Sequence, residues 1–208
     1  MTAEAEEEIR YKAISVKDLL IKINNIVELM IDLAYAAVLF NDVELAEEVL
    51  EFDRQVDYLT TLLHMNISLS VRNRKDAEAM TGIIHIATAS ERISGAAREI
   101  ARTVLSGLSV GEDVIGALSR TEERLVRTEI APESILSGRT RGKLALKTKI
   151  GVDLIAIRRG KDLTINPAGN YKLAAGDVMI ARGSDVGISE LDKLAKGELK
   201  TIPEPVVK

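Results

Sequence analysis

The chain has 208 residues, of which 46% are hydrophobic and 29% are charged, a balance typical of a folded soluble protein and not of a disordered one. It contains no cysteine, which excludes disulfides, iron–sulfur clusters and thiolate metal sites. Two histidines in the whole chain also argue against a histidine-rich zinc site.

The sequence gives little sign of membrane insertion or export. A membrane-spanning helix needs roughly 18–20 apolar residues in a row, and the nearest candidate, Leu29–Phe40, contains Asp32. The first ten residues are acidic, whereas a secretory signal begins with basic residues and continues with an apolar segment. We therefore expect a cytoplasmic protein that reaches the membrane only through a partner.

The N-terminal half is predicted to form three antiparallel helices. Apolar residues recur at alternating spacings of three and four, which is the pattern of packed helices. Asn41 and Glu44 resemble a capping box that begins the second helix, and Gly107 is a suitable end for the third. The three predicted seams are Leu19, Ile23, Ile26, Met30, Leu33 and Ala37; Leu45, Val49, Phe52, Val56, Leu59 and Leu63; and Ala79, Ile83, Ile86, Ser90, Ile93, Ala97, Ile100 and Val104.

The second half reads as a small module of mixed α and β structure. A strand is expected over Arg124–Ile130, with Val126, Thr128 and Ile130 on one face. Ser184 is a suitable N-cap for a final helix. Three further strands are expected in a meander, at Val152–Ile157, Leu163–Ile165 and Val178–Ala181.

These patterns predict an α+β protein with two domains. The helical bundle is expected over residues 13–107, and a connector helix over 108–121, where Ser109 and Glu112 form a second capping box. The C-terminal domain, with a mainly antiparallel sheet, is expected over 122–197. A flexible tail is expected over 198–208.

The C-terminal module resembles the TrkA-C domain, the C-terminal ligand-binding domain of RCK regulators of potassium and other cation transport. Arg141 departs from the family pattern, in which leucine is more common, so the short helix there is expected to pack differently. RCK regulators usually carry a Rossmann domain before this module, and this chain has a helical bundle instead. The resemblance rests on four segments in the family's order, Ser134–Thr140, Gly151–Arg159, Ile165–Pro167 and Leu173–Gly183.

The TrkA-C resemblance implies a homodimer with a ligand pocket near its two-fold axis. Some domains of this type bind a cyclic dinucleotide there. The matching positions are Ile155, Arg159, Asn166 and Pro167, with Arg159 on a phosphate, Asn166 offering amide hydrogen bonds and the apolar pair packing on a base. The alternative is that Arg159 is only a turn residue and that Asn166 and Pro167 only end a strand.

The helical half resembles one three-helix repeat of a PhoU domain. Asp53-Arg-Gln-Val-Asp57 matches an Asp-x-x-x-Asp motif, and Glu91-Arg-Ile-Ser-Gly95-Ala-Ala97 matches Glu-Arg-Ile-Gly-Asp-x-Ala. In that family such acids are associated with metal clusters, which makes Asp53, Asp57 and Glu91 candidate ligands. Gly95 stands where the last acid is expected, and the alternative is that Asp53 and Asp57 are solvated surface acids.

Charge is distributed unevenly along the chain. Residues 1–107 carry 11 basic and 18 acidic residues, whereas residues 108–208 carry 17 and 14. Within Arg139–Lys161, eight basic residues accompany one acid, Asp153. Such a local field favours a small anionic ligand or an acidic partner surface, although a solvated basic face is the alternative. With 3% aromatic residues and no recognised binding motif, nucleic acid is not an expected partner.

No motif for catalysis stands out in the sequence. It lacks a Gly-x-Ser-x-Gly elbow, a phosphate-binding P-loop and a Gly-x-Gly-x-x-Gly turn, so we expect no enzyme. The first hypothesis is a regulatory subunit for cation transport, with potassium as the first candidate, that senses a small anion at a TrkA-C dimer pocket and acts on a membrane transporter or channel. The cofactor stays unassigned, with a cyclic dinucleotide or another small anion as candidates and a metal not expected. The alternative is a PhoU-like metal-binding or phosphate-response regulator.

Overall fold

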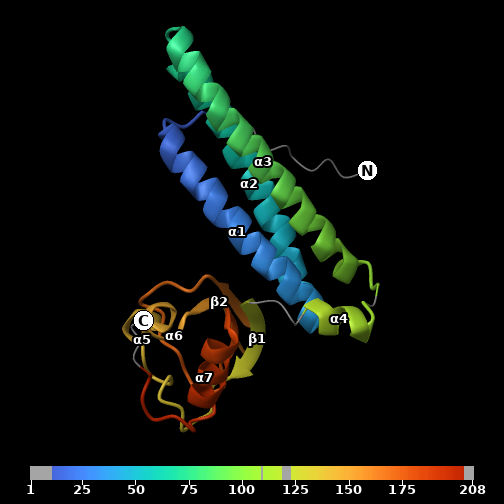
Figure 1. The fold of residues 1–208 in the computed structure, drawn as a ribbon, viewed down its shortest axis with the longest axis vertical. Coiled ribbons are helices and arrows are strands. Elements are labelled where there is room, and N and C mark those ends of the chain that lie inside the picture. The colour runs from blue at the N-terminus through green and yellow to red at the C-terminus, as the bar shows by residue number, and fades with distance from the viewer. Residues whose placement is uncertain (1–10, 109, 119–122, 204–208) are drawn as a thin grey trace. The chain divides into compact units, whose positions relative to one another are not determined.

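The computed structural model describes residues 11–108, 110–118 and 123–203. The chain divides into two compact units, residues 1–109 and residues 110–208, which we call the helical unit and the sheet unit (Figure 1). Ser109, half of the predicted connector capping box, lies outside the described residues, as do 119–122 at the predicted start of the C-terminal domain and 204–208 in the predicted tail.

The helical unit contains three long antiparallel helices, α1 (Val16–Phe40), α2 (Val43–Ser70) and α3 (Arg74–Leu105). Each begins at a capping side chain, Ser15, Asp42 and Asn73 respectively, that accepts a hydrogen bond from a backbone N–H three residues ahead. The prediction that Asn41 caps α2 is wrong by one residue. Asn41 has a left-handed φ of 48° and ends α1, because asparagine tolerates that backbone conformation.

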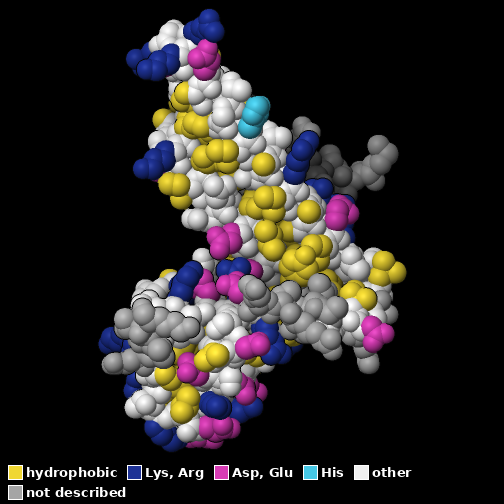
Figure 2. Space-filling model, in the orientation of Figure 1, with side chains coloured by type: hydrophobic (Ala, Val, Ile, Leu, Met, Phe, Trp, Pro, Cys, Tyr) yellow, Lys and Arg dark blue, Asp and Glu magenta, His cyan; other side chains and the backbone are white. Residues whose placement is uncertain are grey.

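The buried face of the third helix is only partly the one predicted: Ser90, Ala97 and Val104 are buried as expected, but two isoleucines of the predicted seam are not. Ile86 and Ile93, assigned to its packed seam, are 49% and 44% exposed. Two possible buried faces, offset by one residue, share part of this helix. One contains Ile86 and Ile93, and the other contains Ala87 and Ser94. The face with polar Ser94 is the one that is buried. Hydrophobic side chains are accordingly visible on the surface of the helical unit (Figure 2). The buried face consists of Ala87, Ser90, Ser94, Ala97, Ala101 and Val104.

Helix α1 is long and apolar enough to cross a membrane by length and composition alone, with a mean hydropathy of 1.6 over its most apolar window. Within the described residues it is the only helix of this kind. Its residues Leu19, Ile23, Met30 and Leu33 are fully buried against the other two helices. A core helix of a soluble bundle passes the same test, so this is weak evidence for insertion.

The sheet unit holds a four-stranded antiparallel sheet with the order β1-β4-β2-β3. The predicted meander is wrong, because β4 lies between β1 and β2 and leaves β3 at an edge. Burial explains the order, since β4 is largely buried and suits the centre, whereas β3 is half-exposed. The elements are α4 (Glu112–Leu118), β1 (Glu123–Glu129), α5 (Arg141–Leu144), α6 (Leu146–Ile150), β2 (Val152–Arg159), β3 (Asp162–Ile165), β4 (Val178–Ser184) and α7 (Asp185–Ala195).

One hydrophobic core holds the sheet unit together. Helix α7 begins at Ser184, whose side chain accepts from the N–H of Gly187, as predicted. The predicted face of β1 is also confirmed, since Thr128 and Ile130 are buried and Val126 packs against the core. The largest core residues include Ile130, Leu136, Leu144, Ile157, Leu173, Met179, Leu191 and Leu194.

Candidate functional site

Three of the four predicted ligand residues meet where strand β3 ends. Ile155 is the extra residue of a β-bulge in β2, and its carbonyl oxygen accepts a 2.7 Å hydrogen bond from the N–H of Asn166. Asn166 has a left-handed φ of 43°, which turns the chain out of the sheet before Pro167. The bulge and the turn therefore hold these residues in fixed positions.

The side chains of this group differ in their access to solvent. Ile155 is 4% exposed and Pro167 is buried, whereas Asn166 is exposed. Within one chain a ligand can reach the Asn166 amide, while the Ile155 and Pro167 side chains fix the backbone around it. The predicted packing of this apolar pair on a base requires them to become accessible.

Arg159 lies at the other end of the hairpin and is held by several partners. Its Nε and Nη2 donate to the two carboxylate oxygens of Asp177 at 2.6 and 2.7 Å, and Nη2 also donates to the Lys172 carbonyl at 2.9 Å. Its guanidinium carbon lies 5.3 Å from the centre of the Tyr171 ring. The hydrogen bond to Asp177 raises the pKa of Arg159 above its ordinary value.

The remaining donor of Arg159 points to how this residue can serve a ligand. Its side chain is 47% exposed, and Nη1 has no hydrogen-bond partner among the described residues. Arg159 follows Ile155 by four positions along the strand, a span of about 13 Å. The four predicted residues thus form two groups on one hairpin and not a single pocket within one chain.

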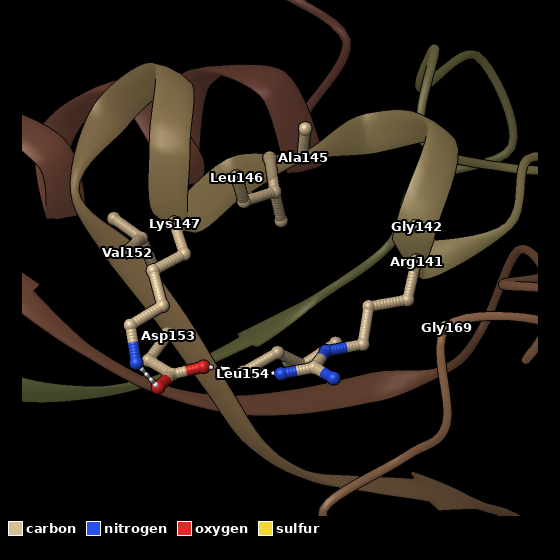
Figure 3. Close-up of a pocket in the computed structure, with 9 residues that line it drawn as sticks. All are labelled: Arg141, Gly142, Ala145, Leu146, Lys147, Val152, Asp153, Leu154 and Gly169. Atoms are coloured by element: carbon tan, nitrogen blue, oxygen red, sulfur yellow. Dashed lines mark hydrogen bonds and ion pairs between the residues drawn. The ribbon is translucent and has the colours of Figure 1, made fainter.

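A cavity of about 150 Å³ lies beside the Asp153 carboxylate in the sheet unit (Figure 3). Arg141 and Lys147 reach the carboxylate of Asp153 from two sides, at 3.1 and 2.7 Å. Arg141 also donates from Nη1 to the Pro167 carbonyl at 3.0 Å, which ties this network to the predicted ligand residues. The cavity is lined by Arg141, Gly142, Ala145, Leu146, Lys147, Val152, Asp153, Leu154 and Gly169.

The charges around this cavity sum to one net positive charge. Burial acts to raise the pKa of Asp153, but Lys147 and Arg141 more than offset it, so that this pKa lies below its ordinary value. Asp153 is therefore ionised at neutral pH and neutralises one of the two cations.

Sequence reasoning missed the partners of these basic residues. Residue spacing alone gives no sign of the role of Asp177, which is fully buried and fixes Arg159. Two signals were available for the second network. Arg141 departs from the family pattern, and Asp153 is the single acid among eight basic residues.

The three predicted metal ligands lie in the helical unit but do not fit a metal ion. Asp53 is buried, and its two oxygens accept hydrogen bonds from Ser94 and Arg98. Asp57 lies one turn further along α2, and Glu91 is half-buried on α3. Within the described residues no three acidic, histidine or cysteine side chains are grouped so that they could hold one metal ion.

Comparison with known proteins identifies both units. Residues 20–104 match the PhoU domain and residues 125–196 match the TrkA-C domain. Ktr system potassium uptake protein C of Bacillus subtilis (strain 168) is 26% identical over 139 residues, which are 67% of this chain and 62% of that relative. The chain thus spans less than two thirds of the relative it matches.

Two solved structures are also similar in part. The RCK C domain of potassium transport protein KtrA, in complex with cyclic diadenosine monophosphate, is 26% identical, covering 45% of this chain and 96% of that chain at a TM-score of 0.33. BusR of S. agalactiae, in complex with promoter DNA, is 10% identical, covering 85% and 98% at a TM-score of 0.35. At TM-scores this low, neither structural likeness supports a conclusion about this chain.

Proposed function

The chain joins a PhoU domain to a TrkA-C domain, and from that premise we propose that it is a non-enzymatic regulatory protein of potassium transport. The single observation that carries the assignment to potassium is the match to Ktr system potassium uptake protein C. The regulator acts from the cytoplasm on a membrane transporter or channel.

The sheet unit senses a small anion in this proposal, and a cyclic dinucleotide is the first candidate. The excess of basic residues over Arg139–Lys161 supports an anionic ligand. Arg159 presents Nη1 for a phosphate oxygen, in an orientation already fixed by Asp177, so little side-chain entropy is lost on binding. Asn166 supplies an exposed amide, and Ile155 and Pro167 hold the turn that carries it.

A homodimer makes this arrangement usable. The two groups of ligand residues lie about 13 Å apart along one hairpin, so they do not meet in a single pocket within one chain. A two-fold axis beside the hairpin pairs each group with its copy in the second chain and doubles the positive charge. Binding of the ligand then favours one arrangement of the dimer, which the membrane partner reads.

Calorimetry with the full chain tests the ligand, with cyclic diadenosine monophosphate, AMP and ATP as probes. Asn166→Gly is the informative variant, because glycine keeps the left-handed backbone and removes only the amide. We expect it to weaken binding of the cyclic dinucleotide roughly tenfold, the value of about one hydrogen bond to a ligand. Lys193→Ala removes an exposed charge from α7, outside the basic segment Arg139–Lys161, and is the control. Flat titrations with all three probes contradict the ligand proposal.

Two further measurements test the dimer and the partner separately. Sedimentation equilibrium of the full chain is expected to give twice the chain mass, and a monomer at high concentration contradicts the shared pocket. Affinity purification from native membranes is expected to recover a potassium transporter or channel with the chain. Failure to recover one, with the dimer and ligand binding intact, contradicts the transport role and leaves the sensor role standing.

A further inference from the structure

A partly buried ion pair joins α2 and α3 of the helical unit, where the PhoU resemblance places metal ligands. Nη1 of Arg98 donates to Oδ2 of Asp53 at 2.6 Å, and the Ser94 hydroxyl donates to Oδ1 at the same distance. The Asp53 side chain is 8% exposed and that of Arg98 is 33% exposed. Both oxygens of this carboxylate are thus occupied by groups from α3.

The position of Arg98 relative to Gly95 is informative. Gly95 stands where the motif of the resembling family has an acid, and a Cβ placed on it would lie 3.7 Å from Nη2 of Arg98. A side chain at position 95 would therefore begin in van der Waals contact with the guanidinium, and a carboxylate there would lie beside it. The position of the missing acid and the guanidinium of Arg98 are thus neighbours on α3.

We infer that the guanidinium of Arg98 takes the place of a metal ion, so that the helical unit carries a built-in cation and folds without metal. An arginine suits this role, because its charge is permanent at any physiological pH and its fork fits a carboxylate. A metal ion is shared among several oxygen ligands and can dissociate, whereas Arg98 is bound covalently to α3. The charge at this place is constant and independent of the metal supply of the cell.

The surrounding electrostatics fit a single permanent cation. Asp57 lies one turn from Asp53, and its pKa is raised by burial and by the Asp53 charge and lowered by Arg98. The pKa of Arg98 itself is raised, mainly by its hydrogen bond to Asp53. The net pKa of Asp57 is still raised, so the guanidinium counters part of the repulsion between two neighbouring acids, as a bound cation would.

Titration of the full chain with Mn²⁺, after treatment with EDTA, tests this inference. Wild-type protein is expected to show no saturable Mn²⁺ binding in calorimetry and no change of Tm with EDTA or Mn²⁺. The double variant Gly95→Asp with Arg98→Ala restores the acid and removes the guanidinium. It is expected to show saturable Mn²⁺ binding that wild type lacks, since it gathers carboxylate oxygens around the vacated space. Binding by both proteins, or by neither, overturns the inference.

A second set of variants tests the ion pair without depending on metal. Arg98→Met leaves the Asp53 charge buried without a partner, and we expect a loss of about 5–10 °C in Tm. Adding Asp53→Asn to Arg98→Met is expected to recover part of that loss. Arg102→Met, one turn further along α3 on an exposed pair with Glu99, is the matched control and should leave Tm nearly unchanged. Equal effects of the two methionine variants overturn the assignment of Arg98.

Discussion

The guanidinium of Arg159 holds the carboxylate of Asp177 with two short hydrogen bonds, at 2.6 and 2.7 Å, although the two residues are separated by 18 positions in the sequence. Asp177 is fully buried and also accepts from the N–H of Ala174. This contact ties the end of the β2–β3 hairpin to the residue before β4. Arg159 therefore supports the fold as well as offering a donor to a ligand.

Arg159→Ala is expected to lower the free energy of unfolding by about 1–3 kcal/mol, because it leaves the buried Asp177 charge without its partner. Asp177→Asn in the same chain should restore part of the loss. Urea denaturation of the single and double variants measures both effects. Arg124→Ala removes an exposed pair with Asp185 in the same unit and should cost at most about 0.5 kcal/mol. Equal losses for Arg159→Ala and Arg124→Ala would contradict a buried role for the pair.

The network of Asp153 predicts loss of stability in acid. Its folded pKa is lowered from the model-peptide value of 3.8, so the folded chain takes up this proton less readily than the unfolded chain. The contribution of Asp153 is fully present above the unfolded pKa and is lost as the pH falls through the folded pKa. Thermal unfolding between about pH 5 and pH 2 should therefore depend less steeply on pH in Asp153→Asn than in wild type. Identical slopes would show that Arg141 and Lys147 do not stabilise the carboxylate.

The raised pKa of Asp57 predicts the opposite effect of ionisation on stability. Burial, followed by the charge of Asp53, raises its pKa in the folded state, so ionised Asp57 destabilises the helical unit at neutral pH. Asp57→Asn is expected to raise Tm at pH 7 by a small amount, of the order of 1 °C for an exposed side chain. The gain should vanish at about pH 3, where the carboxyl group is protonated in both states. Glu47→Gln, on the exposed face of the same helix, is the control, and a lower Tm for Asp57→Asn would contradict the sign.

Two glycines in helices predict opposite outcomes for one kind of substitution. A Cβ on Gly187 would lie 2.2 Å from the Ile150 carbonyl oxygen, so Gly187→Ala should destabilise the sheet unit by about 1–3 kcal/mol. A Cβ on Gly82 in α3 would meet nothing within 4 Å, so Gly82→Ala should stabilise the helical unit by about 0.5–1 kcal/mol through helix propensity. Denaturation of both variants decides the matter. A stabilised Gly187→Ala would mean that α7 does not approach α6 closely.

Much of the fold could be predicted because its signals are local. Heptad spacing and capping residues located three helices, and the short apolar runs located the strands. The face of α3 could not be predicted, since Ile93 and Ser94 lie on competing stripes and hydrophobicity alone favours isoleucine. The choice depends on the Asp53 carboxylate of another helix, which accepts from Ser94. Strand order could not be predicted for a similar reason, because the order of strands along the chain does not show which strand is buried in the middle of the sheet.

Likewise, only part of the candidate site can be predicted from the sequence. The hairpin that carries Ile155, Arg159 and Asn166 follows from residue type and resemblance. The partners of its cations do not, since Asp177 and Asp153 reach them through tertiary contacts between separate elements. Patterns of spacing along one chain identify which residues bear charge, and only the folded arrangement shows which charges are already neutralised.

The central position of β4 has a consequence for the order in which the protein is made. The helical unit consists of three consecutive helices that pack on one another, so it can fold once α3 has left the ribosome. The sheet cannot form until residues 178–184 have been synthesised, because β4 is the strand that joins β1 to β2. A nascent chain arrested before that strand would carry a folded helical unit followed by an unpaired β1, open to capture by chaperones or by other chains.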